Sequence, residues 1–166
     1  MKFVILTGMS GAGKSTAIKM MEDIGYYCVD NLPIALLEKF VELSSLQENA
    51  ELQKVAVGID IRNGQALEEI RDVLERIKKK KVHYEILFLD AVLVKRYKET
   101  RRNHPLSGGD RVDKGIEEER KRLAFLKESA DYIIDTSQLL TRELKAEIEK
   151  IFVQNQDYKN LFITIL

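Results

Sequence analysis

The sequence predicts an α/β fold in which a parallel sheet carries helices on both of its faces. Two observations predict it: apolar runs alternate with helical patterns along the chain, and a glycine-rich turn joins the first run to the first helical pattern. At 166 residues the chain is long enough to bury one core but too short for a second core of similar size. We therefore expect one main domain and place it at residues 1–159.

The strands are predicted from short runs of Val, Ile, Leu, Phe and Tyr bounded by turn residues. These runs are residues 2–6, 26–29, 55–61, 84–89, 132–135 and 161–166. Apolar residues at helical spacing predict helices between them, at about residues 15–24, 31–44, 67–81, 91–102, 116–127 and 142–152.

Local signals predict where three of these helices begin or end. Gly25 suits the position that follows a helix, and Asn31 suits an N-cap with Pro33 in the first helical turn. The lysines at 78–81 suit the negative end of a helix dipole. A binding patch is the alternative interpretation of this lysine run.

The most specific motif lies at residues 8–15, where GMSGAGKS fits the pattern G-x-x-x-x-G-K-[ST] between an apolar run and a helical pattern. Backbone N–H groups of such a loop surround phosphates, and we expect Lys14 and Ser15 to bind the β and γ phosphates and a Mg²⁺. The dinucleotide fingerprint G-x-G-x-x-G is not met, so NAD is not favoured. The expected nucleotide contacts are Gly8, Met9, Ser10, Gly11, Ala12, Gly13, Lys14, Ser15 and Thr16.

Phosphoryl chemistry also needs a carboxylate near the Mg²⁺, usually at the end of a strand beside the loop. Asp60 has the flanking sequence most typical of that position, which makes it the first candidate metal ligand together with Ser15. Asp30 is the alternative, as metal ligand or general base, whereas Asp90 and Asp135 are expected to cap strand ends. The candidate catalytic residues are Lys14, Asp60 and Asp30.

Residues 95–122 carry an excess of basic side chains around a loop rich in Pro, Gly and Ser. Arg101 and Arg102 lie where a mobile lid would bring guanidinium groups over triphosphate oxygens, although a solvated helix face is the alternative. A phosphate-binding loop with an arginine-bearing lid is the layout of nucleoside monophosphate kinases. It predicts a P-loop NTPase fold of the nucleoside-kinase-like type, with a small-molecule or nucleotide kinase as one candidate function. The basic segment makes an RNA-binding module a further candidate.

Charge and composition limit the partners that the chain as a whole can attract. Lys plus Arg equals Asp plus Glu at 27 each, so no general attraction to nucleic acid or to a membrane is expected. Cys28 is the only cysteine, which excludes a disulfide within the chain. The N-terminal apolar run is too short for a signal peptide, and no run approaches a membrane span. We therefore expect a cytoplasmic location.

Several distinctive segments occur together: GMSGAGKS at 8–15, GYYCVDNLP at 25–33, DIRN at 60–63, KRYKETRRNHPL at 95–106 and ADYIIDTS at 130–137. In combination they resemble the RapZ/YvcJ family of bacterial P-loop nucleotide-binding proteins, also called RNase adapter proteins. The resemblance implies an N-terminal domain that binds and slowly hydrolyses ATP and GTP with Mg²⁺. Residues 8–15 then match the ATP-binding segment. A second segment, assigned to GTP in the family, matches Asp60, Ile61, Arg62 and Asn63.

The resemblance also implies a C-terminal domain in the longer protein. Because the chain stops inside an apolar run, we expect residues 160–166 to be the first strand of that domain, with a natural final core strand as the alternative. Full-length enterobacterial members bind small regulatory RNA, largely through the C-terminal half, and guide it to an endoribonuclease; neither partner is expected for this fragment alone. A homo-oligomer is expected at full length. The leading hypothesis is a regulatory nucleotide-binding domain with weak hydrolysis.

Overall fold

The computed structural model describes residues 2–9, 11–46, 53–61, 64–90, 112–137, 139–153 and 161–163. Its centre is a six-stranded sheet in the order β2-β3-β1-β4-β5-β6, and every strand pairing is parallel. The strands are β1 (Lys2–Gly8), β2 (Tyr27–Val29), β3 (Lys54–Gly58), β4 (Glu85–Asp90), β5 (Tyr132–Asp135) and β6 (Leu161–Ile163). Each of the six predicted strands is therefore present.

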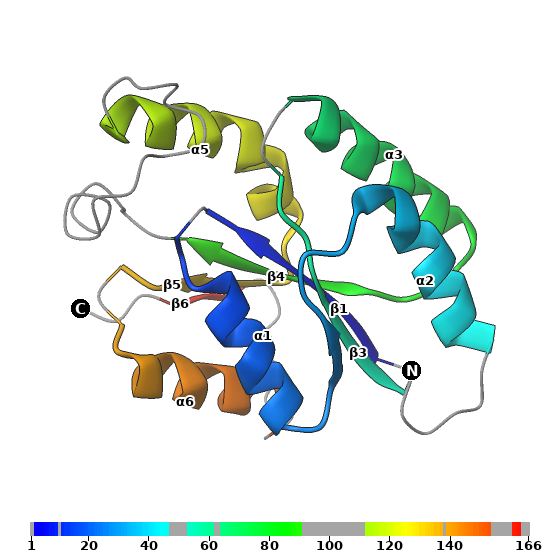
Figure 1. Ribbon diagram of the computed structural model, residues 1–166, viewed down its shortest axis with the longest axis horizontal. Coiled ribbons are helices and arrows are strands. Elements are labelled where there is room, and N and C mark those ends of the chain that lie inside the picture. The colour runs from blue at the N-terminus through cyan, green and yellow to red at the C-terminus, as the bar shows by residue number, and fades with distance from the viewer. Residues whose placement is uncertain are drawn as a thin grey trace.

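Helices cover both faces of the sheet, as predicted (Figure 1). One face carries α1 (Lys14–Asp23) and α6 (Thr141–Phe152), and the other carries α2 (Ile34–Leu46), α3 (Gly64–Lys79) and α5 (Val112–Ser129). The helix predicted at residues 91–102 lies outside the described residues. Among the described helices, none is both long and apolar enough to cross a bilayer.

The central strand β1 positions the glycine-rich turn. Residues Phe3 to Leu6 are buried, because β3 and β4 flank the strand and helices cover both of its faces. This is the continuous apolar run expected of an inner parallel strand. The turn that follows β1 consequently lies in the middle of the carboxyl edge of the sheet, where ligands of open α/β folds bind.

The end of α1 agrees with the prediction, since Gly25 has φ of 99° and follows the helix. The Gly25 N–H donates to the Glu22 carbonyl at 3.1 Å, and the Tyr26 N–H donates to the Met21 carbonyl at 3.0 Å. Together these bonds form a Schellman motif.

The predicted start of the second helix was wrong. The helix α2 begins at Ile34, and Asn31 takes a left-handed conformation with φ of 56° instead of capping it. The reason is a tertiary hydrogen bond: the Leu32 N–H donates to the Gly58 carbonyl at 2.8 Å, which holds this segment against the end of β3. The strand predicted to reach residue 61 likewise ends at Gly58.

Charged side chains join α2 to α3. Glu38 accepts a hydrogen bond from Arg76 at 2.9 Å and pairs with Lys80 at 2.8 Å, and Lys80 also contacts Glu42. Hydrogen bonds from Lys80 and Arg76 hold the pKa of the Glu38 carboxyl below its usual value. One lysine of the run at 78–81 therefore serves to connect two helices.

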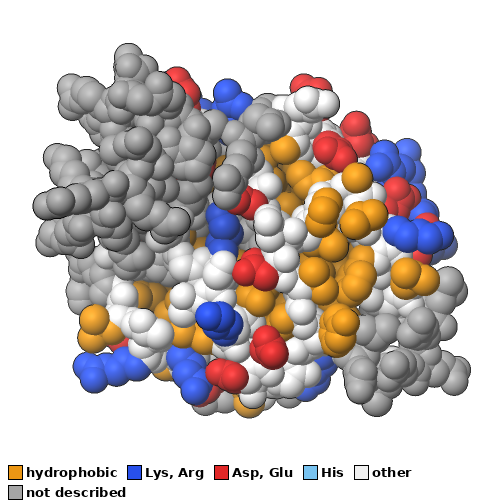
Figure 2. Space-filling model, viewed as in Figure 1, with side chains coloured by type: hydrophobic (Ala, Val, Ile, Leu, Met, Phe, Trp, Pro, Cys, Tyr) orange, Lys and Arg blue, Asp and Glu red, His pale blue; other side chains and the backbone are white. Residues whose placement is uncertain are grey.

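Apolar side chains gather on the outer surface of α2 (Figure 2). Leu36 and Leu43, seven positions apart, are 54% and 47% exposed. This spacing places both on one side of the helix. That side faces away from the core.

The strand β6 extends the sheet at its edge beyond β5, with Tyr132 opposite Leu161 and Ile134 opposite Ile163. Its pairing shows that residues 161–163 belong to the same sheet as the other strands. The expectation that residues 160–166 open a further domain remains a prediction.

Candidate nucleotide-binding site

The glycine-rich turn has the backbone that its sequence predicts. Gly11 and Gly13 have φ of 76° and 97°, a region that glycine enters without steric cost. Gly8 is required for a different reason, because a Cβ there would lie 2.1 Å from the Leu89 carbonyl oxygen of β4. The loop is therefore held against the neighbouring strand, and the Met9 N–H donates to that same carbonyl at 2.9 Å.

Lys14 is folded over the mouth of this loop. Its Nζ donates to the Gly8 carbonyl at 2.9 Å and contacts the Met9 carbonyl at 3.4 Å. The same atom lies 3.9 Å from Oδ1 of Asp60. The ammonium group thus lies beside the loop. A bound phosphate could replace these carbonyl oxygens as the acceptor of its hydrogen bonds.

Ser15 and Asp30 form the second polar contact of the site. The Ser15 hydroxyl donates to Oδ2 of Asp30 at 2.8 Å, which connects the first turn of α1 to the end of β2. The other carboxylate oxygen, Oδ1, lies only 2.9 Å from the position that a Cβ on Gly58 would occupy. The Asp30 carboxylate can therefore approach Ser15 because residue 58 is a glycine.

A cavity of about 270 Å³ collects these groups. It opens at the carboxyl edge of the sheet, where β1, β2 and β3 end. The structure thus brings both candidate carboxylates to one cavity, with Asp60 beside the ammonium and Asp30 beside the hydroxyl. Its lining consists of Lys14, Ser15, Asp30, Asn31, Gly58, Ile59 and Asp60.

Thr136 supports the loop from the end of β5, and the sequence did not identify it as a site residue. Its buried hydroxyl lies 2.9 Å from the Ala12 carbonyl and 3.2 Å from the Asp90 carbonyl, while its N–H donates to the latter at 2.8 Å. This one residue connects the glycine-rich loop to the ends of β4 and β5. The only signal was its place in ADYIIDTS, directly after a strand.

The other strand-end aspartates have structural contacts. Asp90 pairs with Arg120 at 3.2 Å and with Lys127 at 2.8 Å, which anchors α5 to the end of β4. Asp135 accepts a hydrogen bond from the Ser137 N–H at 2.9 Å and caps the turn after β5. The Asp135 contact agrees with the predicted capping of a strand end, whereas the Asp90 side chain forms ion pairs with α5 instead.

Of the other residues predicted to contact nucleotide, two have described positions and five do not. Thr16 is exposed in the first turn of α1, and Ile61 is buried in the core. Outside the described residues lie Ser10, Arg62, Asn63, Arg101 and Arg102. Their predicted roles remain predictions.

Oxygen ligands suited to Mg²⁺ are present, although the described residues hold no cluster of three or more His, Cys, Asp or Glu side chains. Such a cluster is unnecessary for Mg²⁺ at a nucleotide, because the ion usually takes one or two protein ligands, several waters and the phosphates themselves. The Ser15 hydroxyl and the carboxylates of Asp30 and Asp60 meet that requirement in one cavity. The residues therefore fit the ion that the loop motif implies.

The fold is that of kinase-like P-loop NTPases. A shikimate kinase from Acinetobacter baumannii, solved in complex with shikimate, superimposes with a TM-score of 0.60 over 93% of this chain and 94% of its own. Another from Bacteroides thetaiotaomicron gives 0.55 over 90% and 95%. The sequence identities of 19% and 16% make this a similarity of fold.

Sequence comparison gives a closer relationship. A nucleotide-binding protein from Agathobacter rectalis is 68% identical across the whole chain, and one from Lachnoclostridium phytofermentans is 65% identical. The chain spans 58% and 59% of the lengths of these two relatives. The model of the RapZ-like N-terminal domain matches residues 1–156. The chain therefore belongs to the RapZ-like N-terminal domain family.

Proposed function

We propose that this chain is a regulatory nucleotide-binding domain that takes up ATP and GTP with Mg²⁺ in the cytoplasm and hydrolyses them slowly. The observation that carries the proposal is the single cavity that joins Lys14, Ser15, Asp30 and Asp60 at the start of α1. A phosphate there would meet the N-terminus of the helix, the N–H groups of the loop and the Lys14 ammonium. The name of the relatives, nucleotide-binding protein, supports the nucleotide-binding part of the proposal.

Each residue has a distinct task in this proposal. Lys14 exchanges the carbonyl oxygens of Gly8 and Met9 for phosphate oxygens and neutralises part of their charge. Ser15 keeps its lone pairs available for a cation while its proton is donated to Asp30. When bound, Mg²⁺ would neutralise charge that develops on the phosphates.

Asp30 becomes the first candidate for the carboxylate beside the cation, because it is the one in contact with Ser15. Asp60 then serves mainly to orient the Lys14 ammonium, at 3.9 Å. Asp60 also opens the segment 60–63 that the family resemblance assigns to GTP. We further propose that Arg101 and Arg102 contact the phosphates as part of a lid.

The longer protein has further proposed roles that this chain alone does not carry out. Since the chain spans 58% of the first relative, the rest of such a protein is available to sense nucleotide state. We propose that the full-length protein is a homo-oligomer that binds small regulatory RNA and an endoribonuclease, as RNase adapters do. For the chain itself we propose only nucleotide binding and slow hydrolysis.

A small-molecule kinase is the second candidate, and it has one specific observation in its favour. Asp30 and Asn31 line the cavity beside the loop, so a hydroxyl group of an acceptor could reach the Asp30 carboxylate there. Asp30 would then accept the proton as the hydroxyl attacks the γ phosphate. The shikimate kinase fold of the neighbours supports this candidate only at the level of architecture.

The deciding experiment measures phosphate release from Mg-ATP and from Mg-GTP without an acceptor, for the chain and for Lys14→Ala. Slow release that disappears in Lys14→Ala is the expected result. Calorimetric titration should show nucleotide affinity falling at least about tenfold in this variant, since a charge-assisted phosphate contact is lost. Unchanged affinity would show that the loop is not the site. Release that requires an added small-molecule hydroxyl acceptor would favour the kinase.

A further inference from the structure

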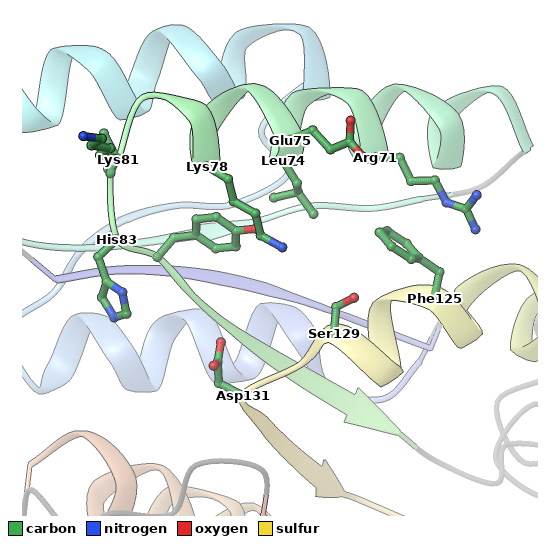
Figure 3. A pocket seen from close by; sticks show the side chains of 11 residues that line it. Arg71, Leu74, Glu75, Lys78, Lys81, His83, Phe125, Ser129 and Asp131 are labelled. Atoms are coloured by element: carbon green, nitrogen blue, oxygen red, sulfur yellow. The ribbon is translucent and has the colours of Figure 1, made fainter.

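A larger cavity, of about 780 Å³, lies at the opposite end of the sheet between α3 and α5 (Figure 3). Tyr84 and Asp131, which immediately precede β4 and β5, form part of its wall. The cavity is therefore at the amino edge of the sheet, whereas the phosphate loop follows β1 at the carboxyl edge. Its volume falls in the range of about 300–1,000 Å³ typical of small-molecule sites.

Cationic side chains outnumber acidic ones on the wall of this cavity, where Glu75 of α3 and Asp131 are the acidic members. Arg71, Lys78 and Lys81 contribute to the wall, and Lys78 extends from α3 toward the centre of the space in Figure 3. Lys80, by contrast, points to Glu38 and Glu42 of α2. The lysine run thus divides between a helix–helix contact and the cavity wall.

Lys81 occupies a position where its side chain has an energetic cost. It has φ of 59°, the left-handed conformation in which glycine usually follows a helix, and its N–H donates to the Lys78 carbonyl at 3.0 Å. A residue with a Cβ pays roughly 1–2 kcal/mol there. Strain of this kind occurs both at helix ends and at binding sites, and Lys81 both ends α3 and lines the cavity wall.

A flat platform lies at the other end of the cavity. The Arg71 guanidinium stands over the Phe125 ring, 4.5 Å from its centroid, and Figure 3 shows these side chains approaching each other from α3 and α5. Guanidinium planes and aromatic rings are surfaces on which planar ring systems stack. Phe125 is only half-buried, so part of the ring remains available.

The acidic and hydroxyl groups of the wall determine which way an anion would face. Asp131 accepts a hydrogen bond from the Ile86 N–H at 2.9 Å, so its carboxylate is fixed near the start of β4. Burial, and next the charge of Asp131, raise the pKa of Tyr84 to about 12, which keeps its hydroxyl a donor. Asp131 would repel an anion toward Lys78 and Lys81 and could accept hydrogen bonds from hydroxyl or amino groups.

We propose that this cavity is a second ligand site, independent of the phosphate loop, for a small organic anion that carries a planar ring. The ring stacks on the pair formed by Arg71 and Phe125. The anionic group lies beside the ammonium group of Lys78, and Lys81 adds positive charge at the edge of the cavity. Ser129 and Asp131 form hydrogen bonds to the polar part that joins the ring to the anion.

The test uses the ¹⁵N-labelled chain and three probes without Mg²⁺: AMP, which has a ring and a phosphate; adenosine, which has the ring; and ribose 5-phosphate, which has the phosphate. AMP is expected to shift the amide signals of Ser129 and Asp131 in a saturable manner. Adenosine and ribose 5-phosphate should each bind at this position at least about tenfold more weakly, since each lacks one of the two contacts.

Variants locate the effect. Lys78→Glu combined with Lys81→Glu should weaken AMP binding at Ser129 and Asp131 at least about tenfold. Lys145→Glu, a single charge reversal at an exposed position of α6, should leave it unchanged. Phe125→Leu keeps an apolar side chain in contact with the core but removes the aromatic ring on which the ligand would stack. It should also weaken AMP binding.

Lys14→Ala separates this proposal from that of the phosphate loop, because it should abolish shifts at Gly11 and Gly13 and retain those at Ser129 and Asp131. Shifts confined to Gly11 and Gly13, or no shifts at millimolar AMP, would overturn the second site. Ribose 5-phosphate binding as tightly as AMP would overturn the requirement for a ring.

Discussion

The Ser15 hydroxyl donates a hydrogen bond to Oδ2 of Asp30 at 2.8 Å, across the gap between the phosphate loop and the end of β2. This contact favours Asp30 for the position beside the cation, for which the sequence alone ranks Asp60 first. The Asp30 carboxylate accepts the hydrogen bond of the Ser15 hydroxyl, and the Asp60 carboxylate lies 3.9 Å from the Lys14 ammonium. Two oxygen donors for a cation and one oriented ammonium group therefore occupy neighbouring parts of the same cavity.

The first prediction compares Asp30→Asn with Asp60→Asn. Asp30→Asn should lower Mg²⁺-dependent phosphate release about 100-fold while nucleotide affinity changes less than about threefold, because a carboxylate beside the reacting phosphate acts mainly in the transition state. Asp60→Asn should lower release less than about tenfold. Turnover and calorimetric affinity, measured for ATP and GTP, check both. A larger loss in Asp60→Asn would return the metal position to Asp60.

Gly58→Ala tests the approach of Asp30 to the loop. The added methyl would stand 2.9 Å from Oδ1 of Asp30, so the carboxylate must move away from Ser15. We expect phosphate release to fall about tenfold or more, with the folded state retained as judged by circular dichroism. In an Asp30→Ala background the same substitution should have no further effect on release, because the displaced group is already absent. Additive losses in the double variant would mean that Gly58 acts by another route.

Thr136→Val removes the hydroxyl that lies 2.9 Å from the Ala12 carbonyl and keeps the shape of the side chain. Since Thr136 is buried, the lost hydrogen bond should lower the free energy of unfolding by about 1–3 kcal/mol, measured in urea. A less constrained loop should also bind nucleotide several-fold more weakly. Thr136→Ser, which retains the hydroxyl, is the matched control and should keep most of the affinity. Equal affinities in all three proteins would show that the contact does not position the loop.

The reactivity of the Cys28 thiol tests whether its surroundings raise its pKa. Burial, and next the charge of Glu22, raise the pKa of its thiol to about 12, so the thiol remains protonated at neutral pH. Allowing for the higher intrinsic nucleophilicity of such a thiolate, alkylation at pH 8 should be about 100-fold slower than in the urea-unfolded chain. The folded-state rate should keep rising with pH between 8 and 10. Because Cys28 is the only cysteine, mass spectrometry reports it directly, and a plateau near pH 9 would contradict the raised pKa.

The sequence was sufficient for the elements whose signals are local. Apolar runs identified all six strands, and glycine at position 25 identified the end of α1. The N-cap expected at Asn31 was wrong because the hydrogen bond from Leu32 to Gly58 is tertiary and overrides the local preference of asparagine. The contact of this segment with β3, rather than its neighbours in the sequence, therefore determines the conformation of Asn31 before α2.

The geometry of the site depended on contacts between distant parts of the chain. Which strand-end aspartate reaches Ser15 depends on the strand order, in which β2 lies two strands away from β1. The Asp30 carboxylate lies against Gly58 of the intervening strand β3 where it meets Ser15, and a glycine within a strand pattern was the available signal. Thr136 contacts Ala12 across 124 positions, which no local pattern could indicate.

The last prediction concerns pH and the ion pairs between α2 and α3. Hydrogen bonds from Lys80 and Arg76 lower the pKa of Glu38 from its ordinary 4.5, so the folded state binds a proton there less readily than the unfolded state. The contribution of this carboxylate to stability is therefore fully present above pH 4.5 and is lost as the pH falls through the lowered value.

Glu38→Gln should lower the melting temperature slightly at pH 6, and the difference from the parent chain should be smaller at pH 3 and in 1 M NaCl. Glu69→Gln, an exposed change on α3 outside this cluster, is the control and should leave the melting temperature unchanged at both pH values. A difference for Glu38→Gln that persists undiminished at pH 3 would show that the side chain stabilises the helix pair by packing rather than by its charge.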